Sequence, residues 1–435
     1  MTPELALALL LGGFVLLFSI GVPLAVSLLF ASVAVIAFDP GLELLVVPLK
    51  VFSGMNNFLL LAIPGFLFAA LMMNKVGVTE DIVRLSDLIV GRIKGGLAHI
   101  NVVSSMLMGG VSGSSTADVA GIGAILIPTM KVKGYSPGFS AALTAASSSI
   151  GSIIPPSILM VIYGASANVS IGALFVAGYI PGILVGLQQL AIAWYYARKF
   201  GVDAGSSEPM PKREMLIVLA RGLVPVSVIL VIIGGVLTGV MTATESAAVA
   251  SAYVILVGVI VYRRVTISMI MEVAVETALL TAVVMFCVGT ATLFGWLMSF
   301  YGVLNVAGDL VGSYATSPFT FLLFATLLFL LLGTFMDPAP AMLIFVPVLA
   351  ALAPQVGADP LQLGILIIMA LAIGKITPPY GISLLLACTI AEIPLSKGMG
   401  WTVVFFLAFC VLLLVLILVP EITLWLPKLL TPDLV

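Results

Sequence analysis

Long apolar runs dominate the chain, and short polar stretches separate them. Ranges that contain no Asp, Glu, Lys or Arg include 5–37, 51–74, 134–197, 222–244, 277–308 and 398–420. A helix of roughly 20 apolar residues is long enough to cross the hydrocarbon core of a bilayer, and each run reaches that length. The pattern therefore predicts an all-α, polytopic membrane protein, in which we expect ten membrane-spanning segments, the second of them over residues 24–50.

Polar, Gly- and Pro-containing stretches interrupt these runs, and they match each other. The stretch GYSP at 134–137 corresponds to GADP at 357–360, and IGSIIPP at 150–156 corresponds to IGKITPP at 373–379. The residue numbers of both pairs differ by 223, which indicates a duplicated unit.

The charges of equivalent loops indicate that the two copies have opposite orientations. The segment 77–94 carries Arg84, Arg92 and Lys94, whereas its counterpart at 302–316 has no Lys or Arg. Cytoplasmic loops are enriched in basic residues, so equivalent loops lie on opposite faces, as inverted-topology repeats require. We predict a first repeat over 1–205, a cytoplasmic linker at 206–213 and a second repeat over 214–435.

Each repeat is expected to contain a hairpin that enters and leaves the membrane on the same side. Basic residues flank the stretch at about 95–130 at both ends, so its tip falls near 112–118. The equivalent hairpin is expected at about 317–353, with its tip near 333–340. Each repeat also contains a broken membrane-spanning helix, which we place at 134–165 and 361–390.

The segment 80–93 predicts an amphipathic helix along the cytoplasmic surface of the membrane. Its apolar positions recur at helical spacing, at Ile82, Leu85, Leu88, Ile89 and Ile93. The positions expected to face water are Asp81, Arg84, Asp87 and Arg92.

The helix breaks point to ion and anion binding. A helix that stops inside a membrane leaves N–H groups unpaired at one end and C=O groups at the other. Positive N-terminal ends suit an anionic substrate, while carbonyl and hydroxyl oxygens suit a cation such as sodium. We predict two symmetry-related sodium sites formed by Ser112, Gly113, Ser114, Ser147, Ser148, Gly151, Gly333, Asp337, Gly374 and Thr377. The anion site between them is expected to include Ser114, Ser115, Thr116, Ser149, Pro155, Pro156, Lys375, Thr377, Pro378 and Pro379.

Close helix packing is the alternative explanation of these small residues. Gly109 and Gly113 form a GxxxG pair of the kind that lets membrane helices approach each other. Packing does not explain why both clusters recur at one offset, once in each repeat. We therefore favour transport.

Four ionisable residues lie in apolar surroundings, where a charge is costly: Asp118, Glu245, Asp337 and Lys375. Glu245 fits an N-terminal helix cap as well as a site, and Asp118 also fits helix stabilisation. Asp337 is the best cation ligand of the four. Three partners are possible for Lys375: Asp337, the anion of the substrate, or water reached along its own stem.

Composition gives little support to catalysis. Of the 435 residues, 62% are hydrophobic and 8% charged, which excludes a soluble fold. The chain has one histidine, His99, and three cysteines without paired spacing, Cys287, Cys388 and Cys410. No candidate base accompanies the serines, so we expect neither an enzyme nor an organic cofactor, and no nucleic-acid binding.

The ordered motifs resemble those of one transporter family. The runs GGVSGSSTADVAGIGAILIPTM, SSSIGSIIPPSI, GVMTATESAAV, GTFMDPAPAM and IGKITPPYG are similar to the large membrane subunit of tripartite ATP-independent periplasmic (TRAP) transporters. The resemblance covers essentially the whole chain. Lys375 departs from it, since the family normally has an uncharged residue there.

The resemblance implies a sodium-driven elevator transporter of the ion-transporter superfamily in a bacterial inner membrane. It also implies two partners: a small four-helix membrane subunit, and a periplasmic solute-binding protein that delivers an organic anion, usually a carboxylate or sulfonate. The alternatives are a stand-alone anion permease of the same superfamily, which needs no binding protein, and a passive channel, whose flux would not depend on sodium.

Overall fold

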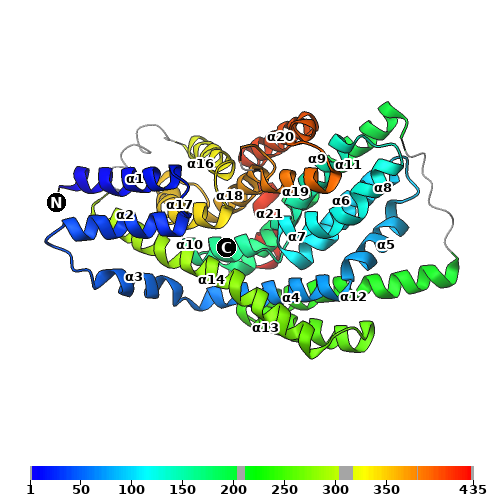
Figure 1. The fold of residues 1–435 in the computed structure, drawn as a ribbon, viewed down its shortest axis with the longest axis horizontal. Coiled ribbons are helices and arrows are strands. Elements are labelled where there is room, and N and C mark those ends of the chain that lie inside the picture. The colour runs from blue at the N-terminus through cyan, green and yellow to red at the C-terminus, as the bar shows by residue number, and fades with distance from the viewer. Residues whose placement is uncertain (1, 203–210, 303–316, 380, 433–435) are drawn as a thin grey trace.

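The computed structural model describes residues 2–202, 211–302, 317–379 and 381–432, and these fold into helices without a strand (Figure 1). Seven helical stretches are long and apolar enough to cross a membrane: Phe58–Val76, Ile171–Phe200 (α11), Lys212–Leu237 (α12), Ala243–Tyr262, Ile267–Phe300 (α14), Pro338–Val356 and Leu395–Leu418 (α20). Shorter apolar helices accompany them. The chain is an all-helical, multi-pass membrane protein.

The N-terminal region differs from the sequence prediction in one respect. We expected a single span over 24–50, but α1 (Pro3–Ser19) is followed by α2 (Leu24–Phe38), and a separate helix α3 (Val46–Met55) begins after a loop. The loop starts at Asp39-Pro40-Gly41. Proline disfavours a helical conformation at the residue before it, so α2 ends there.

Helix α3 leads through a 3₁₀ turn (Phe58–Leu61) into α4 (Ala62–Val76). This interrupted path occupies the positions in the first repeat that the continuous α14 occupies in the second. Helix α14 packs against α3, α4 and α2, while α4 packs against α13 (Ala243–Val257). The third segments of the two repeats, α3–α4 and α14, therefore cross each other. Helix α14 also contacts α2, the second segment of the first repeat, and α4 contacts α13, the second segment of the second repeat.

The chain turns back at both predicted hairpin tips. Helix α6 (Gly96–Ser112) ends at Gly113, whose positive φ of 58° suits glycine. The chain returns beside α6 through α7 (Ser115–Asp118), a π turn and α8 (Ala124–Val132) (Figure 1). In the second repeat α16 (Pro318–Gly333) turns into α17 (Pro338–Leu352). That each hairpin enters and leaves the membrane on the same side stays a prediction.

Both predicted broken helices are interrupted where Gly, Ser and Pro cluster. Helix α9 (Pro137–Ser148) is followed by a 3₁₀ turn at Ser149–Ser152, called η3 here, and then by α10 (Ile158–Ala167). In the second repeat α18 (Pro360–Gly374) is followed by α19 (Ile382–Ala391). The Pro155–Pro156 and Pro378–Pro379 peptide bonds are both cis.

The matching GYSP and GADP motifs start these broken helices in the same way. Ser136 accepts a hydrogen bond from the N–H of Phe139, and Asp359, 223 positions later, accepts one from the N–H of Leu361. Each of these N-caps is followed by a proline in the first turn, where its missing N–H costs nothing. The similarity of the two motifs therefore reflects the same N-terminal capping of α9 and α18.

Helix α5 (Val78–Val90) is the expected amphipathic helix, with one correction. It packs against α6 and α12. Asp81, predicted to face water, is only 6% exposed and accepts a hydrogen bond of 2.8 Å from the hydroxyl of Tyr262. That prediction was wrong because a distant donor compensates the buried carboxylate. Apart from residue 302, the counterpart segment 302–316 lies outside the described residues.

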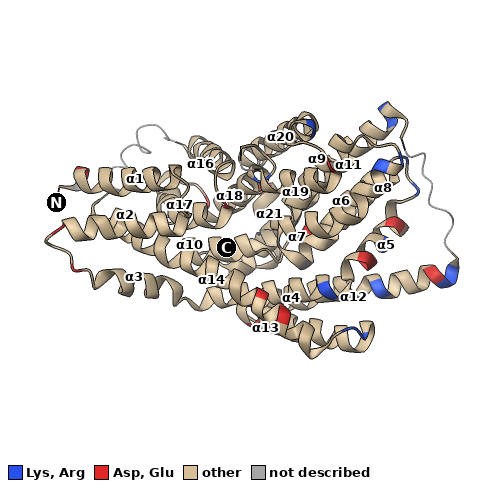
Figure 2. Cartoon of the chain, in the orientation of Figure 1, with Lys and Arg blue, Asp and Glu red and all other residues tan. Residues whose placement is uncertain are grey.

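Charged side chains are distributed unevenly along the molecule. Figure 2 shows Lys and Arg gathered at the end formed by α8, α11 and the start of α12. The opposite end, at α1 and the α2–α3 loop, carries acidic residues. This distribution supports a cytoplasmic location for the basic end.

Candidate functional site

The two hairpin tips and the two helix breaks meet in the middle of the molecule. Helix α7, at the first tip, packs against η3 of the first break and against α19, which follows the second break. The turn η3 in turn contacts α18, and α18 packs against α16 and α17 of the second hairpin (Figure 1). Residues more than 200 positions apart therefore share one region.

Glycine lets each hairpin approach the break of its own repeat at backbone distance. A methyl group added to Gly109 would lie 2.8 Å from the Cα of Gly151. A methyl group added to Gly333 would lie 3.1 Å from the Cα of Gly374. The predicted site residues Gly151, Gly333 and Gly374 therefore have a packing role, and the same contact is made twice.

Asp118 is the most unusual polar group at the first tip. Its side chain is 1% exposed, and its Oδ1 accepts a hydrogen bond of 2.5 Å from the Ser112 hydroxyl. Its Oδ2 is buried and has no hydrogen-bond partner among the described residues. A methyl group added to Gly151 would lie 2.5 Å from this Oδ2, so the missing side chain of Gly151 makes room for the carboxylate.

Asp118 was not among the site residues selected from the sequence, although its position in an apolar segment was the available signal. Ser112, which was selected, is its direct partner. Ser114 is joined to the same group, because its N–H donates to the Ser112 hydroxyl at 3.3 Å. Ser114 and Thr116 share a hydroxyl–hydroxyl bond of 3.2 Å.

The serines of the first break are buried and bonded to protein. Ser115 and Ser152 share a hydroxyl–hydroxyl bond of 2.7 Å, which joins the tip to the break. Ser148 donates to the carbonyl of Ala145, and Ser149 donates to that of Ala146. Pro155 and Pro156 are also buried.

Ser147 belongs to a different cluster. Its hydroxyl donates to Asn101 Oδ1 at 2.9 Å and accepts from Ser105 at 3.0 Å. Asn101 also donates to Thr144 at 2.7 Å. These side chains join α9 to the middle of α6, and the hydroxyl of Ser147 is engaged there rather than at the hairpin tip.

The second tip is more open than the first. Asp337 is exposed and caps α17, where its Oδ1 accepts a hydrogen bond of 3.2 Å from the N–H of Ala339. Thr377 is half-buried, and its hydroxyl donates to the carbonyl of Ile373 at 3.0 Å. Pro378 is half-buried and Pro379 is exposed.

Lys375 follows α18 directly and is 9% exposed. No ion pair or hydrogen bond joins its ammonium to a residue in the described part of the chain.

Glu245 stabilises the N-terminus of α13, which is one of the two roles that its sequence position suggested. It forms a capping box with Thr242: the Glu245 N–H donates to the Thr242 hydroxyl at 3.2 Å, and the Thr242 N–H donates to Glu245 Oε2 at 2.8 Å. Both hydrogen bonds lie on the exposed surface at the start of α13.

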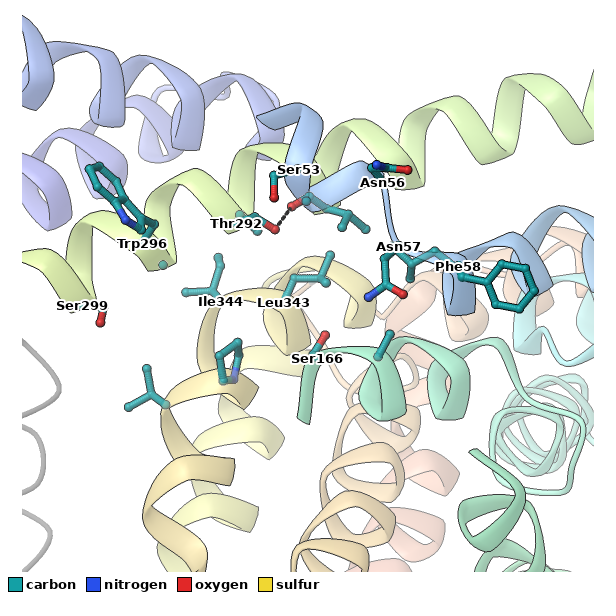
Figure 3. Close-up of a pocket in the computed structure, with 18 residues that line it drawn as sticks. Ser53, Asn56, Asn57, Phe58, Ser166, Thr292, Trp296, Ser299, Leu343 and Ile344 are labelled. Carbon is teal, nitrogen blue, oxygen red and sulfur yellow. Dashed lines mark hydrogen bonds between the residues drawn. The ribbon is translucent and has the colours of Figure 1, made fainter. Parts of the chain in front are cut away.

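Two cavities flank the hairpins. One of about 650 Å³ lies between α14, α10, α17 and the connection from α3 to the 3₁₀ turn Phe58–Leu61, and Figure 3 shows Asn57, Ser166 and Leu343 around it. It contains none of the predicted site residues. The other, of about 610 Å³, is lined by α4, α14 and the first tip, and three predicted residues reach it: Ser112, Ser114 and Thr116.

The two cavities occupy related positions in the two repeats. Ser53 lines the first cavity and Glu276 lines the second, and their numbers differ by 223. The same holds for Asn57 and Leu280. Each cavity thus lies between one hairpin and the crossed third segments.

Comparison with known proteins gives the family. The model of the tripartite ATP-independent periplasmic transporter, DctM component, matches residues 11–422. The sialic acid TRAP transporter large permease protein SiaM of Vibrio cholerae is 35% identical over 94% of this chain and 95% of its own length. The isethionate TRAP transporter permease protein DctMQ of Oleidesulfovibrio alaskensis is 35% identical over 90% of this chain and 61% of its own length.

Among solved structures, the YdaH transporter of Alcanivorax borkumensis has a similar fold. The TM-score is 0.58 at 16% sequence identity, over 85% of this chain and 87% of that one. The sequence matches extend over nearly the full chain and include its hairpin tips and breaks. The chain therefore belongs to the DctM component family of the TRAP transporters, and it is a transporter permease rather than an enzyme.

Proposed function

We propose that this permease carries out sodium-coupled uptake of a small organic anion, a carboxylate or a sulfonate, across a bacterial inner membrane. One observation carries the proposal. Asp118 holds a carboxylate oxygen in a buried position without a hydrogen-bond partner among the described residues. A buried, unpaired anionic oxygen is costly, and a bound cation offsets that cost.

The surroundings of Asp118 suit sodium, which prefers oxygen ligands. Ser112 and Ser114 supply such oxygens next to Asp118, and we assign further oxygens to the backbone of the adjacent first break. The second site is assigned to the equivalent region of the other repeat, with Asp337, Thr377 and the backbone at Gly333 and Gly374. Its more open position fits a site that exchanges its ion with the surroundings.

The anion is assigned to the space between the two breaks. Helix ends interrupted inside a membrane present N–H groups with partial positive charge. We assign the serines and threonines of the first tip and the Pro-Pro turns of both breaks to this anion site, and the cavity that Ser114 and Thr116 line supports the assignment at the first tip. The SiaM and DctMQ relatives are named for sialic acid and isethionate, which carry a carboxylate and a sulfonate.

Movement of the hairpins relative to the crossed helices would give alternating access. The two related cavities, one beside each hairpin, support this elevator mechanism because they leave space along the same interface in both repeats. The inverted repeats, with hairpins that enter from opposite sides, are part of the same proposal.

Two partner proteins are proposed: a small four-helix membrane subunit and a periplasmic solute-binding protein. The family supports both. The DctMQ relative supports the first, since the match covers 61% of it and the rest of that permease is additional chain.

The test is uptake into proteoliposomes that contain the permease and both partners. Uptake of the anion is expected to require an inward sodium gradient and to stop when choline replaces sodium. Equal uptake in choline would exclude sodium coupling. Equal uptake without the binding protein would favour a stand-alone permease.

A further inference from the structure

A groove of about 450 Å³ lies between α11 and α20, away from both hairpin tips. We call it the α11–α20 groove. Its lining residues come from one face of the end of α11 and from the start of α20: Ala191, Ile192, Tyr195, Lys199, Trp401 and Val404. None of them belongs to the sodium or anion sites proposed above, so that function leaves the groove without a role.

The wall of the groove is a cluster of packed aromatic rings. The ring of Trp401 lies edge-on to Tyr196 at 5.0 Å and to Phe139 at 5.3 Å, measured between ring centroids. The hydroxyl of Tyr196 donates to Ser136 Oγ at 3.1 Å, and Ser136 is the N-cap of α9. The groove is therefore connected through fixed side chains to the start of the first broken helix.

Two cations lie at the end of the groove, in the basic region that Figure 2 shows. The ammonium of Lys199 lies over the ring of Tyr195 at 5.6 Å, and the guanidinium of Arg198 lies over the ring of Trp194 at 5.3 Å. Each cation follows its ring by one helical turn, so these contacts direct both charges back along α11 toward the membrane. Neither side chain forms an ion pair with a described residue.

An apolar stripe continues from the groove along α20. Exposed apolar residues recur there every three or four positions, at Val404, Leu407, Val411, Leu414 and Leu418. This spacing places them on one face of the helix, and in a membrane-spanning helix such a face contacts acyl chains. The surface thus joins positive charge, aromatic rings and an apolar stripe in the order in which a phospholipid presents its phosphate, glycerol and acyl chains.

We propose that the α11–α20 groove binds an anionic phospholipid of the cytoplasmic leaflet, with its phosphate at Lys199 and Arg198 and an acyl chain along α20. Basic residues at this surface attract anionic lipids, and tryptophan and tyrosine side chains favour the level of the headgroups. The bound lipid would hold α11 against α20 and, through Trp401 and Tyr196, support the start of α9. The proposal goes beyond the transport function and does not depend on sodium coupling.

The test measures thermal stabilisation of the purified permease, freed of native lipid in detergent, by added phosphatidylglycerol or phosphatidylcholine. Choline chloride replaces sodium chloride throughout, so failure of sodium coupling leaves the result unaffected. Phosphatidylglycerol is expected to raise the melting temperature at a lower concentration than phosphatidylcholine does. Equal stabilisation by the two lipids would overturn the proposal.

Two pairs of charge variants locate the phosphate. The variant with Arg198→Gln and Lys199→Gln is expected to need on the order of tenfold more phosphatidylglycerol for half-maximal stabilisation. The variant with Lys212→Gln and Arg213→Gln is the matched control, because it removes the same charge from exposed residues of the basic end that do not line the groove. Equal lipid requirements of the two variants would show general attraction to basic protein and overturn the site.

A steric variant tests the groove without a change of charge. Val404→Trp fills the groove from α20 and is expected to weaken stabilisation by phosphatidylglycerol, while Val403→Trp changes a neighbouring exposed residue outside the groove and is expected to have no effect. The melting temperature without lipid checks that both variants fold. Equal lipid requirements of the two tryptophan variants would overturn the proposal. Loss of binding to the small membrane subunit in Val404→Trp, with its lipid requirement unchanged, would assign the groove to a protein helix instead.

Discussion

The two hairpin tips share a backbone plan but differ in their side chains. Both pack a glycine on the glycine of a helix break, and both hold an aspartate nearby. Asp118 at the first tip is buried and bonded to Ser112, whereas Asp337 at the second is exposed and caps a helix. The two halves therefore share the backbone geometry of the tip, while the polarity and the exposure of the aspartate differ between them.

The broken helices show the same divergence away from the tips. In α9, Thr144 and Ser147 bond to Asn101 of the hairpin. The positions 223 residues later in α18 are Ile367 and Ala370, both buried and apolar. The first hairpin is thus held to its break by hydrogen bonds that the second replaces with apolar contacts.

The largest difference expected between the repeats is the side of the membrane from which a cysteine in equivalent loops can be labelled. Lys133 and Gln355 are exposed residues in nearly equivalent loops. In a variant without Cys287, Cys388 and Cys410, cysteine is placed at either position in turn. A membrane-impermeant thiol reagent applied to spheroplasts is expected to label only the cysteine at 355, and labelling at 133 would contradict the inverted orientation.

Replacement of a glycine by alanine at the contacts between hairpin and break is expected to have the next largest effect, on stability or on sodium dependence. In Gly374→Ala the new carbon would lie 2.5 Å from backbone atoms of Gly333, so the hairpin must shift, at a cost of about 1–3 kcal/mol or more. In Gly151→Ala it would meet the carboxylate of Asp118, which moves more easily than backbone. We therefore expect Gly374→Ala to lose stability and Gly151→Ala mainly to weaken sodium dependence.

Gly234→Ala in α12 is the matched control, because a methyl group there meets nothing within 4 Å. Melting temperature and sodium-dependent uptake are measured for all three variants. Equal stability of Gly374→Ala and Gly234→Ala would show that the second hairpin does not rest on its break.

The smallest effect is expected from the hydrogen-bonded cluster of the first repeat. Thr144→Val removes the hydroxyl acceptor of the Asn101 amide, leaves it only the weak sulfur acceptor of Met130, and is expected to cost about 1–3 kcal/mol. Ile367→Val at the equivalent position removes one carbon and is expected to cost about 0.5–1.5 kcal/mol. A thermal shift in which Thr144→Val is the milder change would mean that the cluster does not stabilise the first repeat.

Much of the backbone plan could be predicted from the sequence. Gly, Ser and Pro mark the hairpin tips and the helix breaks, and the conformational effects of these residues are local. The recurrence of their motifs after 223 positions indicates the repeat. The capped starts at Ser136 and Asp359 are local for the same reason. The end of α2 at Asp39-Pro40 also has a local signal, because a residue that precedes a proline is disfavoured in a helix.

Side-chain roles that depend on distant partners could not be predicted. Asp81 is buried because Tyr262, on another helix, donates to it. Ser147 bonds to Asn101, which is 46 positions away. The carboxylate of Asp118 fits beside Gly151 because glycine has no side chain, and only the folded chain brings these two residues together.

Sodium binding by the two aspartate variants tests the account most directly. Binding of radioactive sodium to the purified permease is measured at constant ionic strength for the unchanged protein, Asp118→Asn, Asp337→Asn and the double variant. The account predicts that each single variant loses part of the bound sodium and that the double variant loses all of it. Binding by the double variant equal to that of the unchanged protein would contradict the assignment of one sodium site to each repeat.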